Sequence, residues 1–324
     1  MANARLAFLA PGSAANSPLA REESGQHAEG DQEADAAEPP PWTRRTSLGD
    51  PAVTTRPCLG TTIVLVLLAG GIRADEPRSS PMQPERDMAL FNGKNLNGLT
   101  AWLKETGHDD PRRVFRVTHE GQLHFTGEGL GYVATERAYR DYHLVVEYRW
   151  GTRTDGGKFV RNSGILLHAT GPDGGAGGTW MSSIECQLAQ GCVGDLIVIR
   201  GKDEAGRTIP VQLTSEVVLG PDRRPRWGEG GTPRLFSGGQ LWWSKHDPDF
   251  KELLDTRGKD DVESPTGEWT RVECRCEGSR IEVSVNGVTV NKAYGLSPTG
   301  GKILLQSEGF ELFVRKFELR PLLK

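Results

Sequence analysis

The stretch "DYHLVVEYRW" at residues 141–150 alternates apolar and polar side chains with the clearest regularity in the chain. Its even-numbered positions, from Tyr142 to Trp150, are all large and apolar, whereas its odd-numbered positions include Glu147 and Arg149. Successive side chains of a strand point to opposite faces, so this pattern predicts a strand with one face on a core.

Similar patterns recur toward the C-terminus. Residues 279–293, "SRIEVSVNGVTVNKA", read as a hairpin, because Asn286-Gly287 supplies the residues that a tight primed turn requires. Residues 301–322, "GKILLQSEGFELFVRKFELRPL", read as two strands around Glu308-Gly309. Helical periodicity is scarce, and 249–258 is at most one short helix. Many short strands with few helices predict an all-β sandwich or jelly roll.

Residues 201–240 have a different composition. The segment "GPDRRPRWGEGGTPRLFSGG" within them is rich in Gly, Pro and Arg, which is typical of loops. A connection of this length is uncommon in a compact domain and is often functional. We therefore expect either a functional loop or a surface insertion without a role.

Composition limits the function classes. The chain has 324 residues and a formal net charge of −4, which argues against a nucleic-acid-binding protein. Cys186 and Cys192 are near enough in sequence to pair, whereas Cys274 and Cys276 lie two apart on one predicted strand and are poor partners. No cysteine spacing matches a zinc site.

The N-terminal quarter is expected to lie outside the folded domain. Residues 1–52 are predicted to be a disordered or misassigned extension, because they are rich in Ala, Glu, Pro, Ser and Gly. Residues 53–74 have the basic flank, short apolar run and final small residue of a signal peptide, with an uncleaved anchor as the alternative. Residues 75–87 would be a linker and 88–322 the β-sandwich. We thus expect export to the periplasm or outside the cell.

Five stretches in order resemble one family, the 3-keto-disaccharide hydrolases. They are "ALFNGKNLNGLTAW" (89–102), "DYHLVVEYRW" with "RNSGILLH" (161–168), "SSIECQLAQGCVGDL" (182–196), "GEWTRVECRCEGSRIEVSVNGVTVN" (267–291) and the C-terminal pair of strands. The resemblance implies a concanavalin-like β-sandwich that cleaves the glycosidic bonds of 3-keto-glycosides by elimination and hydration. Many members carry His before the Gly of the last motif, where this chain has Glu308, so a role of that His does not transfer.

The chemistry that the resemblance implies requires particular groups. A ketone at C3 acidifies the proton on C2, so the site needs a base near C2, a group that stabilises the enolate oxygen and an acid for the leaving group. Glu185, Glu147 and His168 are the predicted catalytic residues. Glu185 ranks first, because its strand is otherwise apolar and a buried carboxylate needs a reason.

Further polar and aromatic residues on these strands and turns are predicted to contact substrate. They are Gln187, Arg149, Asn162, Trp180, Asp195, Trp242, Lys245 and His246. Each also has a structural interpretation: Glu147 with Arg149 as an exposed charge pair, Asp195 as a turn residue, and the histidines as packed residues. Trp242 and Trp243 should face opposite ways, so at most one would meet a sugar.

Two further alternatives stay open at this point. A divalent cation would suit an enolate-forming site, but no ligand spacing demands one, and the metal is unknown. The same sandwich could be a non-catalytic carbohydrate-binding module. An enzyme should gather Glu185, Gln187 and a His or Arg in one pocket, whereas a module should show an aromatic platform. The expected partner is an oxidised sugar, with no nucleic acid, and a membrane only if the signal segment stays uncleaved.

Overall fold

The computed structural model describes residues 80–157 and 159–322. The chain divides into two compact units, and the described fold belongs to the second, Pro77–Lys324. Within the described residues every regular element is a β-strand, and residues 249–258, where the sequence allows at most one short helix, form none. The extension and signal segment predicted for residues 1–74 lie outside the described residues.

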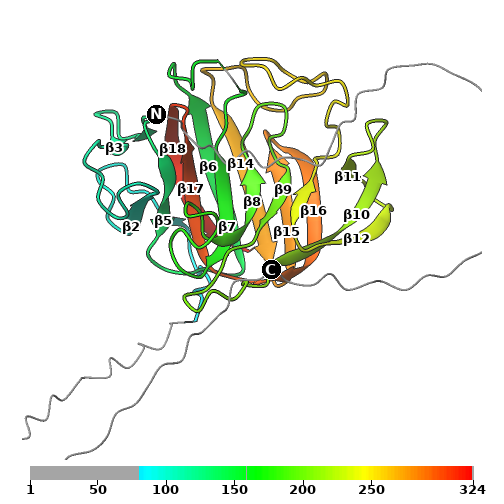
Figure 1. Cartoon of the computed structure of the whole chain (residues 1–324), viewed down its shortest axis with the longest axis horizontal. Helices are drawn as coiled ribbons and strands as arrows, with labels where there is room; N and C mark the ends of the chain where they lie inside the picture. The colour runs from blue at the N-terminus through cyan, green and yellow to red at the C-terminus, as the bar shows by residue number, and fades with distance from the viewer. Residues whose placement is uncertain (1–79, 158, 323–324) are drawn as a thin grey trace, which may run out of the picture. The chain divides into compact units, whose positions relative to one another are not determined.

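The strands form two antiparallel sheets (Figure 1). The larger has eleven strands, with β1 paired to β18 and β12 paired to β10 beside the main path. In spatial order its path is β11 (Pro225–Trp227), β10 (Gln212–Leu219), β16 (Val288–Ser297), β15 (Arg280–Val285), β14 (Thr270–Glu277), β6 (Tyr142–Trp150), β18 (Leu312–Pro321), β4 (Leu123–Phe125) and β3 (Phe115–Val117), and the two additions are β1 (Met88–Ala89) and β12 (Thr232–Phe236).

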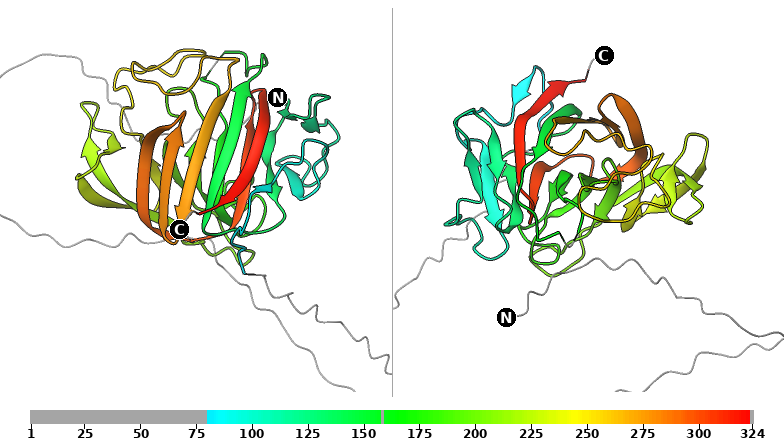
Figure 2. Two further views of the ribbon diagram at one scale, coloured as in Figure 1. Left: turned by 180° about the vertical axis from the view of Figure 1, so that it is seen from behind. Right: turned by 90° about the horizontal axis from the view of Figure 1, so that it is seen from above.

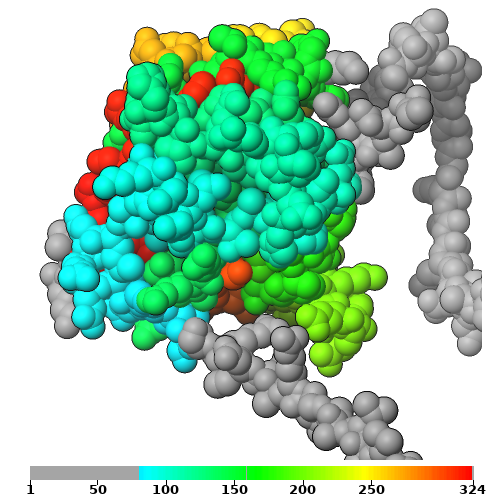
Figure 3. Space-filling view, turned by 90° about the vertical axis from the view of Figure 1, so that its left-hand side faces the viewer, coloured from blue at the N-terminus to red at the C-terminus, as the bar shows by residue number. Residues whose placement is uncertain are grey.

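The smaller sheet has seven strands. In order they are β13 (Gly239–Leu241), β9 (Leu196–Ile199), β8 (Ser182–Gln187), β7 (Gly164–Thr170), β17 (Lys302–Glu308), β5 (Leu130–Thr135) and β2 (Leu99–Leu103). The larger sheet faces the viewer in the left view of Figure 2. Segments near the start of the described chain, cyan to teal, cover most of the side shown in Figure 3.

The main hydrophobic core lies between the sheets. From the larger sheet β6 contributes Leu144 and Val146, both fully buried, and from the smaller sheet β8 contributes Ile184 and Cys186. The predicted all-β sandwich is therefore confirmed. Burial of this apolar area, worth about 25 cal/mol per Å², is its main stabilising contribution.

Local predictions for the C-terminal strands are also confirmed. Asn286 and Gly287 both have positive φ, 49° and 81°, and join β15 to β16 as a primed turn does. Strands β17 and β18 flank Glu308-Gly309 as predicted. All four cysteines of the described chain are buried free thiols, so Cys186 and Cys192 do not pair.

The prediction of a long loop at 201–240 is wrong. Most of this region forms β10, β11 and β12, which we call the arm (residues 212–236), at the right of Figure 1. Within β10, Leu213 and Val217 are buried while Glu216 between them is not, which is the alternation of a strand. The Gly- and Pro-rich turns between these short strands dominate the composition and hide that alternation.

Candidate functional site

Glu185 and Gln187 lie on the face of the smaller sheet that points away from the inter-sheet core. Their neighbours Ile184 and Cys186 face the core, so the alternation predicted for "SSIECQLAQ" holds. Strand pairing sets Glu185 opposite Leu166 and Gln187 opposite Gly164 on β7. We call the polar group built here the Glu185 site: Asn162, Gly164, Glu185, Gln187, Gln306 and Glu308.

Strand β17 completes this site from the other side of β7. Leu304 pairs with Leu166, so Gln306 comes level with Gly164 and Glu308 lies beyond it on the same face. Gly164 leaves the space in which the side chains meet, because a Cβ there would lie 2.2 Å from Gln306 Oε1 and 2.2 Å from Glu185 Oε1. The glycine is therefore required by the closeness of a carboxylate and an amide.

The carboxyl groups of Glu185 and Glu308 interact electrostatically in the site. Only 5% of Glu185 is exposed, and burial raises its pKa well above the ordinary value, with the charge of Glu308 raising it further and the Gln306 amide opposing. Burial also raises the pKa of Glu308 to about 7, against the effect of the Asn162 amide. Among the described residues neither carboxyl group takes part in an ion pair. At neutral pH such a pair favours holding a proton between them.

Two amide oxygens beside these carboxyl groups lack donors. Asn162 Oδ1 and Gln306 Oε1 are buried and accept no hydrogen bond within the described part of the chain. Buried acceptors without partners are costly, so the site is short of hydrogen-bond donors.

Aromatic side chains continue along the same face. Gln306 pairs with Tyr132 on β5, and Tyr132 pairs with Trp102 on β2. Trp180 reaches this face from the loop before β8, with its ring 6.4 Å from that of Tyr132. The Tyr132 hydroxyl donates to Asp173 Oδ1 at 2.5 Å. An apolar aromatic surface beside convergent polar groups is typical of sugar sites.

The structure does not bring Glu147 or Arg149 to this site. Both lie on the outer face of the larger sheet, so the whole core separates them from Glu185. Glu147 accepts from Arg271 at 2.9 Å and Arg315 at 2.6 Å, and hydrogen bonds from these arginines outweigh burial and lower its pKa. Arg149 stacks on Trp269 and Phe313. The structure thus places Glu147, predicted to be catalytic, and Arg149, predicted to contact substrate, apart from the Glu185 site.

His168 is packed inside the fold. It is fully buried, its ring meets Tyr142 of the core edge-on, and its Nδ1 lies 3.0 Å from the Pro298 carbonyl oxygen. Burial lowers its pKa to about 4, so it is neutral at physiological pH. The structure therefore packs His168, predicted to be catalytic, in the interior and does not bring it to the Glu185 site.

Asp195 and His246 form hydrogen bonds that connect the segment after β13 to the loop before β9. The Asp195 carboxylate accepts from Trp243 N at 2.7 Å and Gln240 Nε2 at 2.6 Å, while burial raises its pKa to about 8. His246 is buried against the Gly191 carbonyl oxygen, 3.1 Å from its Nδ1, and burial lowers its pKa. These contacts indicate that Asp195 and His246 have structural roles.

Trp242 and Trp243 face opposite ways, as predicted. Trp243 is buried, whereas the partly exposed Trp242 is covered by the Arg224 guanidinium 5.3 Å from its ring centre. Lys245 is exposed and forms no ion pair within the described residues. Among the described residues no hydrogen bond, ion pair or ring contact joins Trp242 or Lys245 to the Glu185 site. Of the predicted substrate contacts, the structure therefore assembles only Gln187, Asn162 and Trp180 on one face.

Sequence reasoning missed Gln306 and Glu308 as members of the site. The signal was present, because Gln306 and Glu308 alternate with the core-facing residues Leu305 and Ser307 of β17. Glu308 also occupies the position where many relatives carry His. What the sequence could not show is that β17 pairs with β7, which places both residues beside Glu185.

The described part of the chain has neither a metal-ligand cluster nor a membrane-spanning helix. Residues 80–157 and 159–322 contain no group of three or more His, Cys, Asp and Glu side chains placed to hold a metal ion. The same residues contain no helix with the length and apolarity to span a bilayer.

Most of the described chain also matches the profile of a protein family. Residues 87–320 match the profile described as 3-keto-alpha-glucoside-1,2-lyase-like domain. The chain belongs to this family. Membership places it among carbohydrate-active enzymes and confirms the family resemblance of its five motifs. No curated protein matches the chain significantly in sequence.

Solved structures with similar folds share little sequence with the family member described here. A proposed glycosyl hydrolase from Parabacteroides distasonis is 16% identical with a TM-score of 0.43, over 74% of this chain and 94% of that one. A β-glucanase from Bacillus licheniformis is 10% identical with a TM-score of 0.38, over 74% and 98%. The carbohydrate-binding module CBM66 from Bacillus subtilis is 9% identical with a TM-score of 0.37, over 68% and 94%.

Proposed function

We propose that this protein cleaves the glycosidic bond of 3-keto-glycosides by elimination and hydration at the Glu185 site. The observation that carries the proposal is a buried carboxyl pair, Glu185 and Glu308, without a cation partner among the described residues. Such a pair can hold one proton, which provides a base and an acid at once. Elimination requires this combination.

The elimination step uses the two carboxyl groups in opposite roles. The charge of Glu308 favours the shared proton on Glu185, so the reactive protonation state is the one in which that proton has moved to Glu308. In that state Glu185, as carboxylate, removes the proton from C2, and the electrons of that C–H bond form the enolate with the C3 ketone. The enolate then re-forms the ketone while a C1–C2 double bond forms and the C1–oxygen bond breaks. Glu308, as carboxylic acid, donates its proton to the departing oxygen. One proton enters the protein and one leaves, so the pair remains singly protonated.

Hydration returns both groups to their starting states. The Glu308 carboxylate removes a proton from water as its oxygen adds to C1, and Glu185 returns the first proton to C2. Gln187 is placed to stabilise the enolate oxygen, because its Oε1 already accepts from Leu188 N at 3.0 Å and its amide N–H groups remain as donors. The net reaction consumes one water and yields a 3-keto-sugar and an alcohol.

The test compares oxidised with unoxidised sugars. Purified protein is incubated with 3-keto-trehalose, with 3-keto-glucosides and with the parent sugars, and release of the 3-keto-sugar is followed. We expect turnover of the keto-sugars alone and a loss of at least 100-fold in Glu185→Gln, since a general base contributes about 10²–10⁴-fold. Glu147→Gln, which changes a carboxylate on the other sheet, is the matched control and should keep full activity.

One outcome would reject the enzyme, and another would reject Glu185 as its base. Saturable binding of a keto-sugar without turnover would favour a non-catalytic carbohydrate-binding module, which the aromatic face beside the site would also suit. Turnover that persists in Glu185→Gln would show that this carboxyl group is not the base.

We also propose export, on the signal-like pattern of residues 53–74. The measurement is the N-terminal sequence of the protein purified from its own cells. Cleavage after Ala74 is expected, and an intact N-terminus in the soluble cytoplasmic fraction would contradict it.

A further inference from the structure

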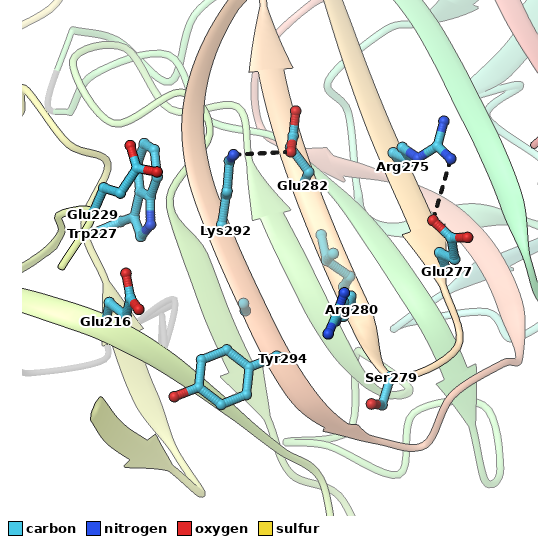
Figure 4. Close-up of a pocket in the computed structure, with 12 residues that line it drawn as sticks. Glu216, Trp227, Glu229, Arg275, Glu277, Ser279, Arg280, Glu282, Lys292 and Tyr294 are labelled. Atoms are coloured by element: carbon cyan, nitrogen blue, oxygen red, sulfur yellow. Dashed lines mark hydrogen bonds and ion pairs between the residues drawn. The ribbon is translucent and has the colours of Figure 1, made fainter. Parts of the chain in front are cut away.

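A cavity lies on the opposite side of the molecule from the Glu185 site. It has a volume of about 640 Å³ and is formed where the arm meets the outer face of β14, β15 and β16 (Figure 4). Small-ligand pockets span about 300–1,000 Å³, so the volume of this cavity lies within the range of pockets that bind small molecules. The residues between this cavity and Glu185 are those of both sheets and the core.

The floor of the cavity is a ladder of opposite charges. Lys292 lies 3.2 Å from Glu282, and Arg275 lies 3.2 Å from Glu277, as the dashed lines in Figure 4 mark. These pairs neutralise one another, so the floor does not select an anion or a cation. This floor is therefore compatible with a neutral ligand.

Other polar groups of the lining remain available to a ligand. Arg280 is exposed and Glu229 lies on the arm, and neither side chain forms a hydrogen bond or ion pair with another described residue. One offers donors only and the other acceptors only. A hydroxyl group can both donate and accept, so a polyhydroxylated molecule could satisfy both.

Two aromatic rings border these charges. Tyr294 on β16 is 39% exposed and pairs across the sheet with Arg280, and Trp227 stands on the arm with the Lys292 ammonium 5.6 Å from its ring centre. The tyrosine ring is open to the cavity in Figure 4. An exposed ring beside hydroxyl-binding groups is the arrangement that holds the apolar face of a sugar.

We propose that this cavity is a second carbohydrate site that binds a short neutral oligosaccharide. Tyr294 stacks on one sugar ring, Arg280 donates to its hydroxyl oxygens, and Glu229 accepts from hydroxyls on a neighbouring ring. The site needs no 3-keto group and no chemistry at Glu185, so it goes beyond the proposed function and can be tested separately. It would hold a glycan on the enzyme while the other face acts.

The experiment titrates maltotriose, cellotriose and laminaritriose into the full chain by calorimetry. Glu185→Gln is used as the background, so that loss of catalysis cannot affect the result. At least one triose should bind, and Tyr294→Ala and Arg280→Ala should each weaken it by at least tenfold. Leu235→Ala is the matched control, because Leu235 is 58% exposed on the arm but does not line the cavity. The affinity of the Leu235→Ala variant for the triose should be unchanged.

Three results would overturn the proposal. They are no binding of any triose, binding that is unchanged in both cavity variants, and a concentration-dependent dimer that Tyr294→Ala abolishes, which would identify the surface as a contact between copies. Thermal unfolding of each variant guards against misfolding. If Tyr294→Ala does not fold, Arg280→Ala, which removes an exposed side chain, still decides the question.

Discussion

The two outer faces of the sandwich carry the same kinds of residue in opposite electrostatic states. On the larger sheet Glu147 is held by Arg271 and Arg315, and their hydrogen bonds lower its pKa. On the smaller sheet Glu185 meets a second carboxyl group, Glu308, and its pKa is raised. A paired carboxylate is fixed in one charge state, whereas an unpaired buried one can exchange a proton near neutral pH. The contrast shows which glutamate can perform proton transfer.

The largest effect is expected from closing the space over Gly164. In Gly164→Ala the new Cβ would lie 2.2 Å from both Glu185 Oε1 and Gln306 Oε1, closer than real Cβ atoms come. The two side chains must move apart, so kcat/KM on a 3-keto-glucoside should fall by about 1,000-fold, since misplacing one group by about 1 Å costs about 100-fold and both the base and the neighbouring amide are displaced. Steady-state kinetics measures it.

A control glycine separates this effect from general strain. In Gly258→Ala the nearest atom would be Asp247 Cβ at 3.1 Å, and activity should stay within about twofold. Full activity in Gly164→Ala would mean that catalysis does not depend on the contact between Glu185 and Gln306. The contrast between Glu185 and Glu147 would then not explain which glutamate transfers the proton.

The second effect concerns Glu308 as the acid. Because burial raises its pKa to about 7, it is protonated below that pH, and leaving-group protonation should be lost as the pH rises through about 7. Glu308→Gln should lower kcat by about 10²–10³-fold on an alkyl 3-keto-glucoside and remove this alkaline limb from the pH profile. A nitrophenyl 3-keto-glucoside, whose leaving group needs no proton, should restore most of the rate.

The same position allows a substitution toward the family pattern. Glu308→His introduces the residue that many relatives carry and should retain more activity than Glu308→Gln on the alkyl substrate, because His can still transfer a proton. Equal loss with both leaving groups in Glu308→Gln would instead assign Glu308 to positioning, not to acid catalysis.

A third buried carboxyl group shows that a raised pKa alone does not mark a site. Glu263 is 4% exposed, and burial raises its pKa to about 8, but its Oε1 accepts from Tyr148 Oη and Trp150 Nε1, both at 2.7 Å. Its folded-state pKa lies above the unfolded value of about 4.5. The folded state therefore holds the proton more tightly, and stability falls as pH rises from about 5 to 8.

Glu263→Gln keeps an oxygen for both donors and removes the titration. In the wild type this titration should lower the unfolding free energy by roughly 2 kcal/mol between pH 5.5 and 8, and in the variant this decrease should be absent. Activity should be unchanged. Urea unfolding at the two pH values measures this. A slope equal to that of the wild type would show that the carboxyl group does not titrate there.

Much of this arrangement follows from sequence, and the remainder depends on long-range pairing. Alternation in 141–150 and 182–190 correctly predicted both strands and which side chains share a face. It could not distinguish Glu147 from Glu185, because their surroundings are set by neighbouring strands far away in the chain. Arg271 approaches Glu147 through β14, and Glu308 approaches Glu185 through β17. The position of His168 was not predictable for the same reason, since only tertiary packing places its ring against Tyr142.

The smallest expected effect is that of Glu147 itself. Its pKa is lowered, so its ion pairs contribute stability above the unfolded pKa and lose it as pH falls through the folded value. Glu147→Gln should cost about 0.5–1 kcal/mol of unfolding free energy at pH 7, less in 1 M NaCl, because outer-face pairs are screened by salt. Activity on keto-sugars should stay within twofold. A loss of activity that accompanied an intact fold would couple the two faces through the core, and Glu185 could then no longer be regarded as acting independently of the larger sheet.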